Sequence, residues 1–144
     1  MKSSLFPDVN VWLALTHDRH VHHPLAARWL EGKGEPLFFC RFTQLGLMRL
    51  LTNERVMGAD VLTQRKAWRA YHRWFEDDRV GFHDEPDPAR LETSFEELST
   101  RSRASTKLWA DAYLGAFART AGLTLVTFDQ ALRTMPSVPI DVLA

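Results

Sequence analysis

The 144-residue sequence predicts an α/β domain, a three-layer α/β/α sandwich whose short, mainly parallel sheet is covered by helices. Two observations lead to this fold class. Short apolar runs of strand length alternate along the chain with longer segments in which apolar residues recur at helical spacing. No linker, internal repeat or low-complexity stretch interrupts the alternation, so we expect a single domain spanning residues 1–144.

The expected elements follow in order along the chain. The first strand should stop at Pro7, because proline cannot continue the ladder of a central strand. The other expected strands are residues 37–40, 80–82, 123–126 and the end of 136–142. Helices are expected to begin near residue 10, near the proline at 24, at Thr43 as N-cap, at Asp60 as cap of a helix reaching about residue 77, at Asp87 and at Thr106.

Composition limits the classes of function. Apolar residues make up 45% of the chain and the formal net charge is zero, so any contact with nucleic acid must rest on a local patch of cations. The one cysteine, Cys40, lies in an apolar run and suits a buried thiol better than a nucleophile. No apolar run reaches the length of a membrane span and no signal peptide is evident, so we expect a cytoplasmic protein with no membrane partner.

Three aspartates stand out because of where they lie. Asp8 and Asp129 each come just after an apolar strand, and ligands bind beyond the carboxyl ends of strands in open α/β sheets. Asp111 lies in a helical segment whose same-face neighbours, Leu108 and Gly115, are apolar or small. An ionised carboxylate in such surroundings needs a cation or hydrogen-bond donors.

A divalent cation is the natural compensation if the fold gathers these carboxylates. Two unit charges about 4 Å apart repel by roughly 4 kcal/mol at an effective dielectric near 20. Mg²⁺, or Mn²⁺ as the alternative, takes oxygen ligands and could activate water for phosphodiester cleavage. The competing interpretation is structural: Asp8 and Asp129 only cap helices, and Asp111 is a satisfied polar residue of the core.

Four stretches in order along the chain resemble the PIN-domain ribonucleases, specifically the VapC-type toxins of bacterial toxin–antitoxin modules. They are residues 8–11 (DVNV), 43–53 (TQLGLMRLLTN), 109–114 (WADAYL) and 125–129 (LVTFD). The resemblance implies a PIN-like sandwich with an acidic pocket and a Mg²⁺-dependent endoribonuclease that hydrolyses RNA phosphodiesters with metal-activated water. It also implies a cognate VapB-type antitoxin and a homodimer as partners.

The resemblance further implies roles for particular residues. By position, Asp8, Asp111 and Asp129 match the acidic residues of the family that hold the metal and carry catalysis. Gln44 stands where many members have Glu, and an amide can orient water or a metal but cannot accept a proton as a carboxylate does. Hydrogen bonds that fix the metal ligands are expected from Asn10 and Thr127.

Four cations are candidates for contacts with RNA phosphates. Arg101, Arg103 and Lys107 precede Asp111 and could lie at the rim of the pocket, and Arg49 is the other candidate. The competing interpretation is a merely basic loop. Two other functions are kept open: a non-catalytic PIN-like module that binds RNA or protein, for which Gln44 is the best support, and a small enzyme acting on phosphorylated metabolites.

Overall fold

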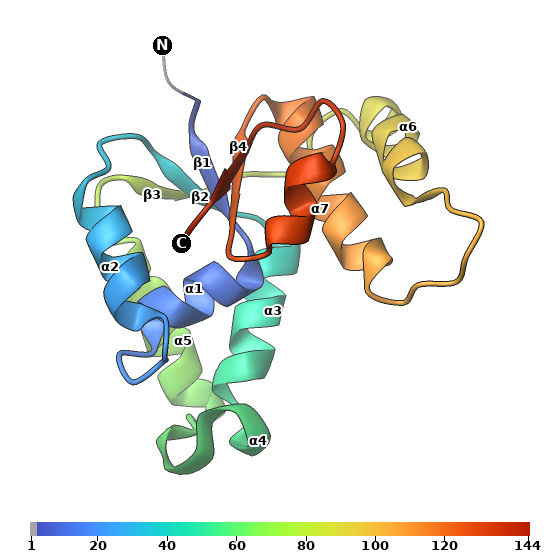
Figure 1. Ribbon diagram of the computed structural model, residues 1–144. Coiled ribbons are helices and arrows are strands. Elements are labelled where there is room, and N and C mark those ends of the chain that lie inside the picture. Colours follow the sequence, from blue (N-terminus) through green and yellow to red (C-terminus); the bar gives the residue numbers. More distant parts are fainter. Residues whose placement is uncertain (1–2) are drawn as a thin grey trace.

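The computed structural model describes residues 3–144, and its centre is a five-stranded parallel sheet (Figure 1). The order of the strands across the sheet is β3-β2-β1-β4-β5, and every neighbouring pair is parallel. The strands are β1 (Leu5–Pro7), β2 (Leu37–Phe39), β3 (Val80–Phe82), β4 (Thr124–Thr127) and β5 (Ile140–Val142). All five expected strands are therefore present, and the central one ends at its proline.

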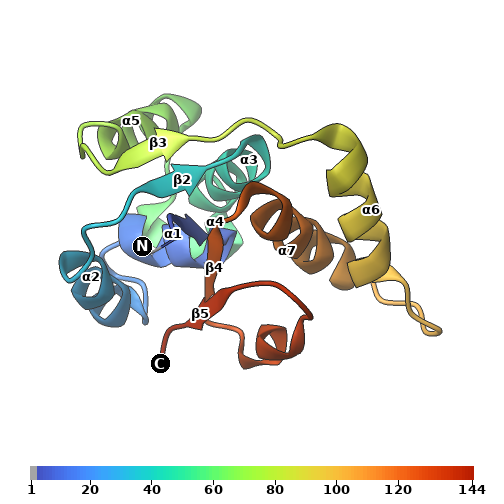
Figure 2. The ribbon, with the colours of Figure 1, turned by 90° about the horizontal axis from the view of Figure 1, so that it is seen from above.

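Helices cover both faces of this sheet, which confirms the predicted sandwich (Figures 1 and 2). Within a strand, neighbouring side chains enter different cores: Leu5 packs with the helices of one face and Phe6 with those of the other. The helices are α1 (Val9–Thr16), α2 (His23–Glu31), α3 (Arg41–Leu51), α4 (Glu54–Met57), α5 (Gln64–Trp74), α6 (Pro88–Ser99) and α7 (Leu108–Ala121), with 3₁₀ turns η1 (Gly58–Asp60) and η2 (Gln130–Thr134).

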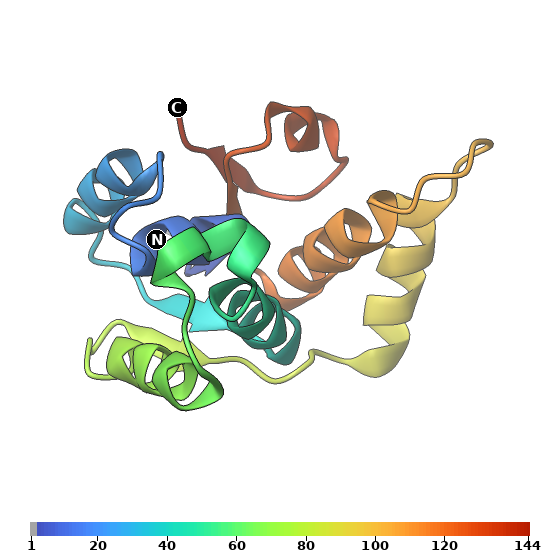
Figure 3. The same cartoon turned by 90° about the horizontal axis from the view of Figure 1, so that it is seen from below.

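The two layers of helices differ in composition. Helices α1, α2, α3 and α5 share one core with the sheet, whereas α6 and α7 form the other (Figure 2). Figure 3 shows that the segment joining α6 to α7 extends away from the rest of the molecule. No helix among residues 3–144 is long and apolar enough to cross a membrane.

Two predicted helix starts are wrong. Helix α3 begins at Arg41, not after Thr43, whose hydroxyl instead accepts a hydrogen bond from the backbone N–H of Cys40 at 3.0 Å. Helix α5 begins after Thr63, and Asp60 lies in η1, where its carboxylate contacts the ring of His17 at 3.2 Å. The start of α3 is set by a local capping box between Cys40 and Thr43, whereas at α5 a tertiary contact with His17 engages Asp60 and Thr63 caps the helix instead.

The first helix is held in place by aromatic packing. Trp12 on α1 is fully buried and stacks on Phe39 of β2 with ring centroids 3.8 Å apart, while Trp74 of α5 packs edge-on against it at 5.4 Å. The backbone N–H of Asp8 donates to the carbonyl of Val126 at 2.9 Å. This packing and this bond fix where the first turn of α1 and its preceding carboxylate lie relative to β4.

We predict that Gly46→Ala destabilises the protein. A Cβ at position 46 on α3 would lie 2.6 Å from Cγ2 of Val9 on α1, so the two helices would have to separate. The free energy of unfolding should fall by about 1–3 kcal/mol, although alanine favours a helix over glycine by about 1 kcal/mol. Urea denaturation of the purified variant measures the change.

Two further variants make this test specific. Gly34→Ala, where a Cβ would meet open space, should change the stability by less than about 0.5 kcal/mol. Adding Val9→Ala to Gly46→Ala removes the obstructing methyl groups and should recover part of the stability. A Gly46→Ala variant as stable as the parent would contradict the proposed close approach of the helices.

Candidate active site

Asp8 lies at the carboxyl end of the central strand and begins the first helix. Its Oδ1 accepts a hydrogen bond from the backbone N–H of Val11 at 3.0 Å, and its Oδ2 accepts one from the hydroxyl of Thr127 at 2.6 Å. Burial raises the pKa of the Asp8 carboxyl, the two hydrogen bonds lower it, and the charge of Asp111 raises it further. The net direction is upward, so the folded protein disfavours the ionised form of Asp8.

Asp129 comes just after β4, the strand next to β1 in the sheet. Its Oδ1 accepts from the backbone N–H of Ala131 at 2.9 Å, which caps η2, and its own N–H donates to the hydroxyl oxygen of Thr127 at 3.0 Å. The hydroxyl of Thr127 thus donates a hydrogen bond to Asp8 and accepts one from the backbone of Asp129. The buried hydroxyl of Thr127 therefore links the residue after β1 to the residues after β4, in agreement with the hydrogen-bonding role expected for Thr127.

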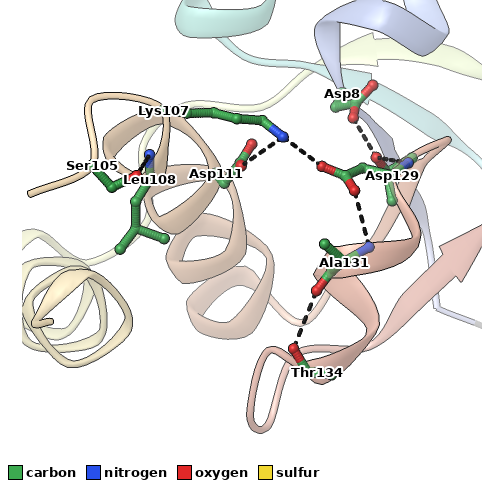
Figure 4. A network of polar contacts seen from close by, with 9 residues as sticks. Asp8, Ser105, Lys107, Leu108, Asp111, Asp129, Ala131 and Thr134 are labelled. Carbon is green, nitrogen blue, oxygen red and sulfur yellow. Dashed lines mark hydrogen bonds and ion pairs between the residues drawn. The ribbon is translucent and has the colours of Figure 1, made fainter. Parts of the chain in front are cut away.

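Asp111 reaches the same region from the first turn of α7 (Figure 4). Burial raises the pKa of the Asp111 carboxyl; the ammonium of Lys107 lowers it, and the charge of Asp129 raises it. The charge of Asp111 also raises the pKa of Asp8, and Figure 4 shows Asp8, Asp111 and Asp129 in one region of the molecule. Carboxylates that lie far apart in the sequence are therefore brought together by β1, α7 and β4.

Lys107 bridges two of these carboxylates. Its Nζ lies 2.7 Å from Oδ2 of Asp129 and 3.9 Å from Oδ2 of Asp111 (Figure 4). The hydrogen bond to Asp129 raises the pKa of Lys107 and holds the pKa of Asp129 below its usual range. As arranged, no three His, Cys, Asp or Glu side chains among residues 3–144 lie close enough together to hold a metal ion. A lysine ammonium occupies the position between the two carboxylates.

The side chains of Gln44 and Asn10 make no hydrogen bond to the three carboxylates among residues 3–144. The amide oxygen of Gln44 accepts a hydrogen bond from Nη1 of Arg41 at 2.6 Å, and no hydrogen bond within residues 3–144 joins Gln44 to the three carboxylates. The side chain of Asn10 is exposed, and it is its backbone N–H that acts on Asp8, lowering the pKa. Arg41 is the residue that the sequence analysis missed; its spacing of three from Gln44 on a helix was the available signal.

The remaining cations lie at two different cavities. Arg101 and Arg103 line a cavity of about 590 Å³ between the end of α6 and the start of α7, next to the exposed indole of Trp109. Arg49 lines a separate cavity of about 380 Å³ between α3 and α5, together with Gln44. None of the three carboxylates lines either cavity, and the cavity at α6 and α7 adjoins the helix that carries Asp111.

We predict that Asp8→Asn stabilises the metal-free protein at pH 7. The raised pKa of Asp8 means that folding costs free energy while this group is ionised. Asparagine keeps an oxygen for the N–H of Val11, and its NH₂ group can donate to the hydroxyl oxygen of Thr127 in place of the hydrogen bond that Oδ2 accepts from it. As the pH falls through the raised folded-state pKa toward 3.8, the folded protein binds a proton and this cost disappears. The advantage of the variant should therefore shrink at acidic pH.

Thermal unfolding of both proteins in EDTA, from pH 7 down to pH 4, measures this difference. Asp111→Asn is the matched variant: its pKa is raised by burial too, so it should shift stability in the same direction. Equal unfolding temperatures for Asp8→Asn and the parent throughout this range would show that the charge of Asp8 carries no such cost.

Comparison with known proteins places the chain in a family. The model of the PIN domain family matches residues 5–137. Ribonuclease VapC41 of Mycobacterium tuberculosis is 41% identical over 145 aligned residues, covering 97% of this chain and 99% of the relative. Ribonuclease VapC38 of the same species is 30% identical, with 94% and 95% covered.

Solved structures agree with this at the level of the fold. The VapBC2 complex of Rickettsia felis, bound to a DNA fragment from its promoter, contains a chain that superposes with a TM-score of 0.70 at 12% identity, covering 97% of this chain and 98% of the other. The Mycobacterium tuberculosis toxin VapC20 gives a TM-score of 0.67 at 21% identity, with 94% and 99% covered. The sequence resemblance is thus confirmed: this chain belongs to the PIN domain family, among its VapC-type ribonucleases.

Proposed function

We propose that this chain is a divalent-metal-dependent endoribonuclease and the toxin of a VapBC-type toxin–antitoxin pair, acting in the cytoplasm. The observation that carries the proposal is the convergence of Asp8, Asp111 and Asp129, in a chain 41% identical to a named ribonuclease over nearly its whole length. A structural role in capping explains one oxygen of Asp8 and one of Asp129. It does not explain why a third, partly buried carboxylate joins them.

The chemistry of this group of side chains suits a hard divalent cation. All three candidate ligands are carboxylates, and a cation already lies between two of them. We propose Mg²⁺ as the ion, held by Asp8, Asp111 and Asp129 after Lys107 has moved away and the three carboxylates have drawn closer together than they lie in this structure. When bound, such an ion neutralises charge that develops on a phosphodiester and makes water a better nucleophile.

The protein's own side chains have distinct proposed tasks. Asp8 is fixed by Thr127 and by the first turn of α1, so its oxygens keep one orientation toward the substrate. Thr127 is a positioning residue that acts through Asp8 and Asp129. Gln44, held by Arg41, can donate and accept hydrogen bonds but cannot serve as the general base.

The proposal also covers the binding partners of the chain and the extent of its domain. Several similar structures are named as VapBC complexes, two of them with DNA, which supports a cognate VapB-type antitoxin here. The match to the PIN domain model over residues 5–137 supports one PIN domain for residues 1–144. A homodimer is proposed from the family; candidate contact surfaces are the exposed side chains of Leu45 and Trp68 on α3 and α5.

We predict that Asp8→Asn and Asp129→Ala each reduce Mg²⁺-dependent cleavage of RNA to background. Thr127→Val should lower the rate by about 10–100-fold because it removes the donor to Asp8, whereas Thr127→Ser keeps the hydroxyl and should retain most of the activity. Cleavage of end-labelled RNA by identically purified proteins measures the rates, with EDTA as the metal-free control. Full activity of Asp8→Asn would rule out this role for the aspartate.

The same assay separates the alternatives. The engagement of Gln44 by Arg41 favours a non-catalytic RNA-binding module as the second candidate function. That candidate predicts that the parent protein binds RNA as tightly as the Asp8→Asn variant does, and that the parent does not cleave RNA with either Mg²⁺ or Mn²⁺. Hydrolysis of small phosphoesters without cleavage of RNA would instead support an enzyme acting on phosphorylated metabolites.

We predict that Arg101 and Arg103 bind RNA phosphates. Both side chains are exposed beside the helix of Asp111. Replacing both with Ala in the Asp8→Asn protein should weaken RNA binding. It should also flatten the plot of log affinity against log salt, by about 0.7 for each phosphate that is no longer bound. Arg65→Ala on the exposed side of α5 is the control. A double variant with unchanged affinity would leave these arginines as a merely basic loop.

A further inference from the structure

Lys107 lies where local helix physics disfavours a cation. It is the residue immediately before α7, and the amino terminus of a helix carries partial positive charge that repels an ammonium group. The pair Lys107–Asp111 also has its cation on the amino-terminal side, the weaker order for residues four apart on a helix. The attraction that holds the ammonium must therefore come from outside this helix.

That attraction comes from across the site. The shortest contact of Lys107 is with Asp129, 22 residues away in sequence, at 2.7 Å. Its Nζ also lies 3.9 Å from Oδ2 of Asp111, so the ammonium contacts two of the three proposed metal ligands. Three carboxylates and one ammonium still leave an excess of negative charge. Lys107 thus offsets part of the repulsion that a divalent ion would offset more fully.

The side chain is free to leave this position. It is 74% exposed, and its recorded polar contacts are with carboxylates alone. All residues from Thr100 to Lys107 are exposed, in the segment that extends from the molecule in Figure 3. A lysine stem has four rotatable carbons, so the ammonium can swing into solvent without any change in the helices that carry the carboxylates.

We propose that Lys107 is a tethered counter-ion that occupies the metal position between Asp111 and Asp129 and must be displaced before a divalent cation binds. The inference rests on the proposed function. An ammonium at 2.7 Å from Oδ2 of Asp129 and a metal on the same oxygen would be like charges in contact, so the two exclude each other. Lys107 therefore stabilises the metal-free protein and lowers its affinity for metal.

Binding of Mn²⁺ to the full chain without RNA tests this, measured by electron paramagnetic resonance of the free ion. Lys107→Met keeps a long side chain but removes the charge, and it should bind Mn²⁺ about fivefold more tightly, the range of one exposed ion pair. Its unfolding temperature in EDTA should be lower than the parent's, and its rise on adding Mn²⁺ larger. Lys107→Arg keeps the charge and should resemble the parent.

The matched control is Lys66→Met on α5, the same substitution at an exposed lysine with no ion pair among residues 3–144. It should leave Mn²⁺ affinity unchanged. Equal or weaker Mn²⁺ binding by Lys107→Met, while the parent binds the ion and cleaves RNA, would overturn the counter-ion role and leave the proposed function standing. Absence of Mn²⁺ binding in every variant would overturn both.

Discussion

The burial of neighbouring carboxylates is the constraint on which the rest of this site depends. The parallel sheet brings the ends of β1 and β4 together, so Asp8 and Asp129 are neighbours whatever their surroundings, and α7 adds Asp111. Burial raises the pKa of both Asp8 and Asp111, which means that the fold maintains two carboxyl groups where their charges are unfavourable. Such a cost is typical of sites that are shaped for a ligand rather than for stability.

Three kinds of hydrogen-bond donor stabilise the negative charge of these carboxylates. A buried hydroxyl at Thr127 and backbone N–H groups at the starts of α1 and η2 each satisfy one oxygen and fix its direction. The ammonium of Lys107 supplies the only full positive charge recorded on these carboxylates within residues 3–144. Fixed donors hold Asp8 and Asp129 in place, and an exposed ammonium lies between Asp111 and Asp129. This arrangement is compatible with the proposed displacement of Lys107 by a metal.

Gln44 is held by a neighbour on its own helix. Its amide oxygen accepts a short hydrogen bond from Arg41, whose guanidinium also lies over the ring of Phe82. An amide carries no charge and cannot accept a proton as a carboxylate does, so in the proposed reaction proton transfer would fall to the aspartates and water.

The strands, the sandwich and the placement of Asp8 and Asp129 at strand ends could all be predicted from the sequence, because short apolar runs and prolines act locally. Other features arise only when distant segments meet in the folded chain. Asp60 pairs with His17 instead of capping a helix, and Lys107 reaches Asp129 across the site. Each outcome depends on which charged or polar group lies within about 3 Å in space, and sequence periodicity carries no information about such distances.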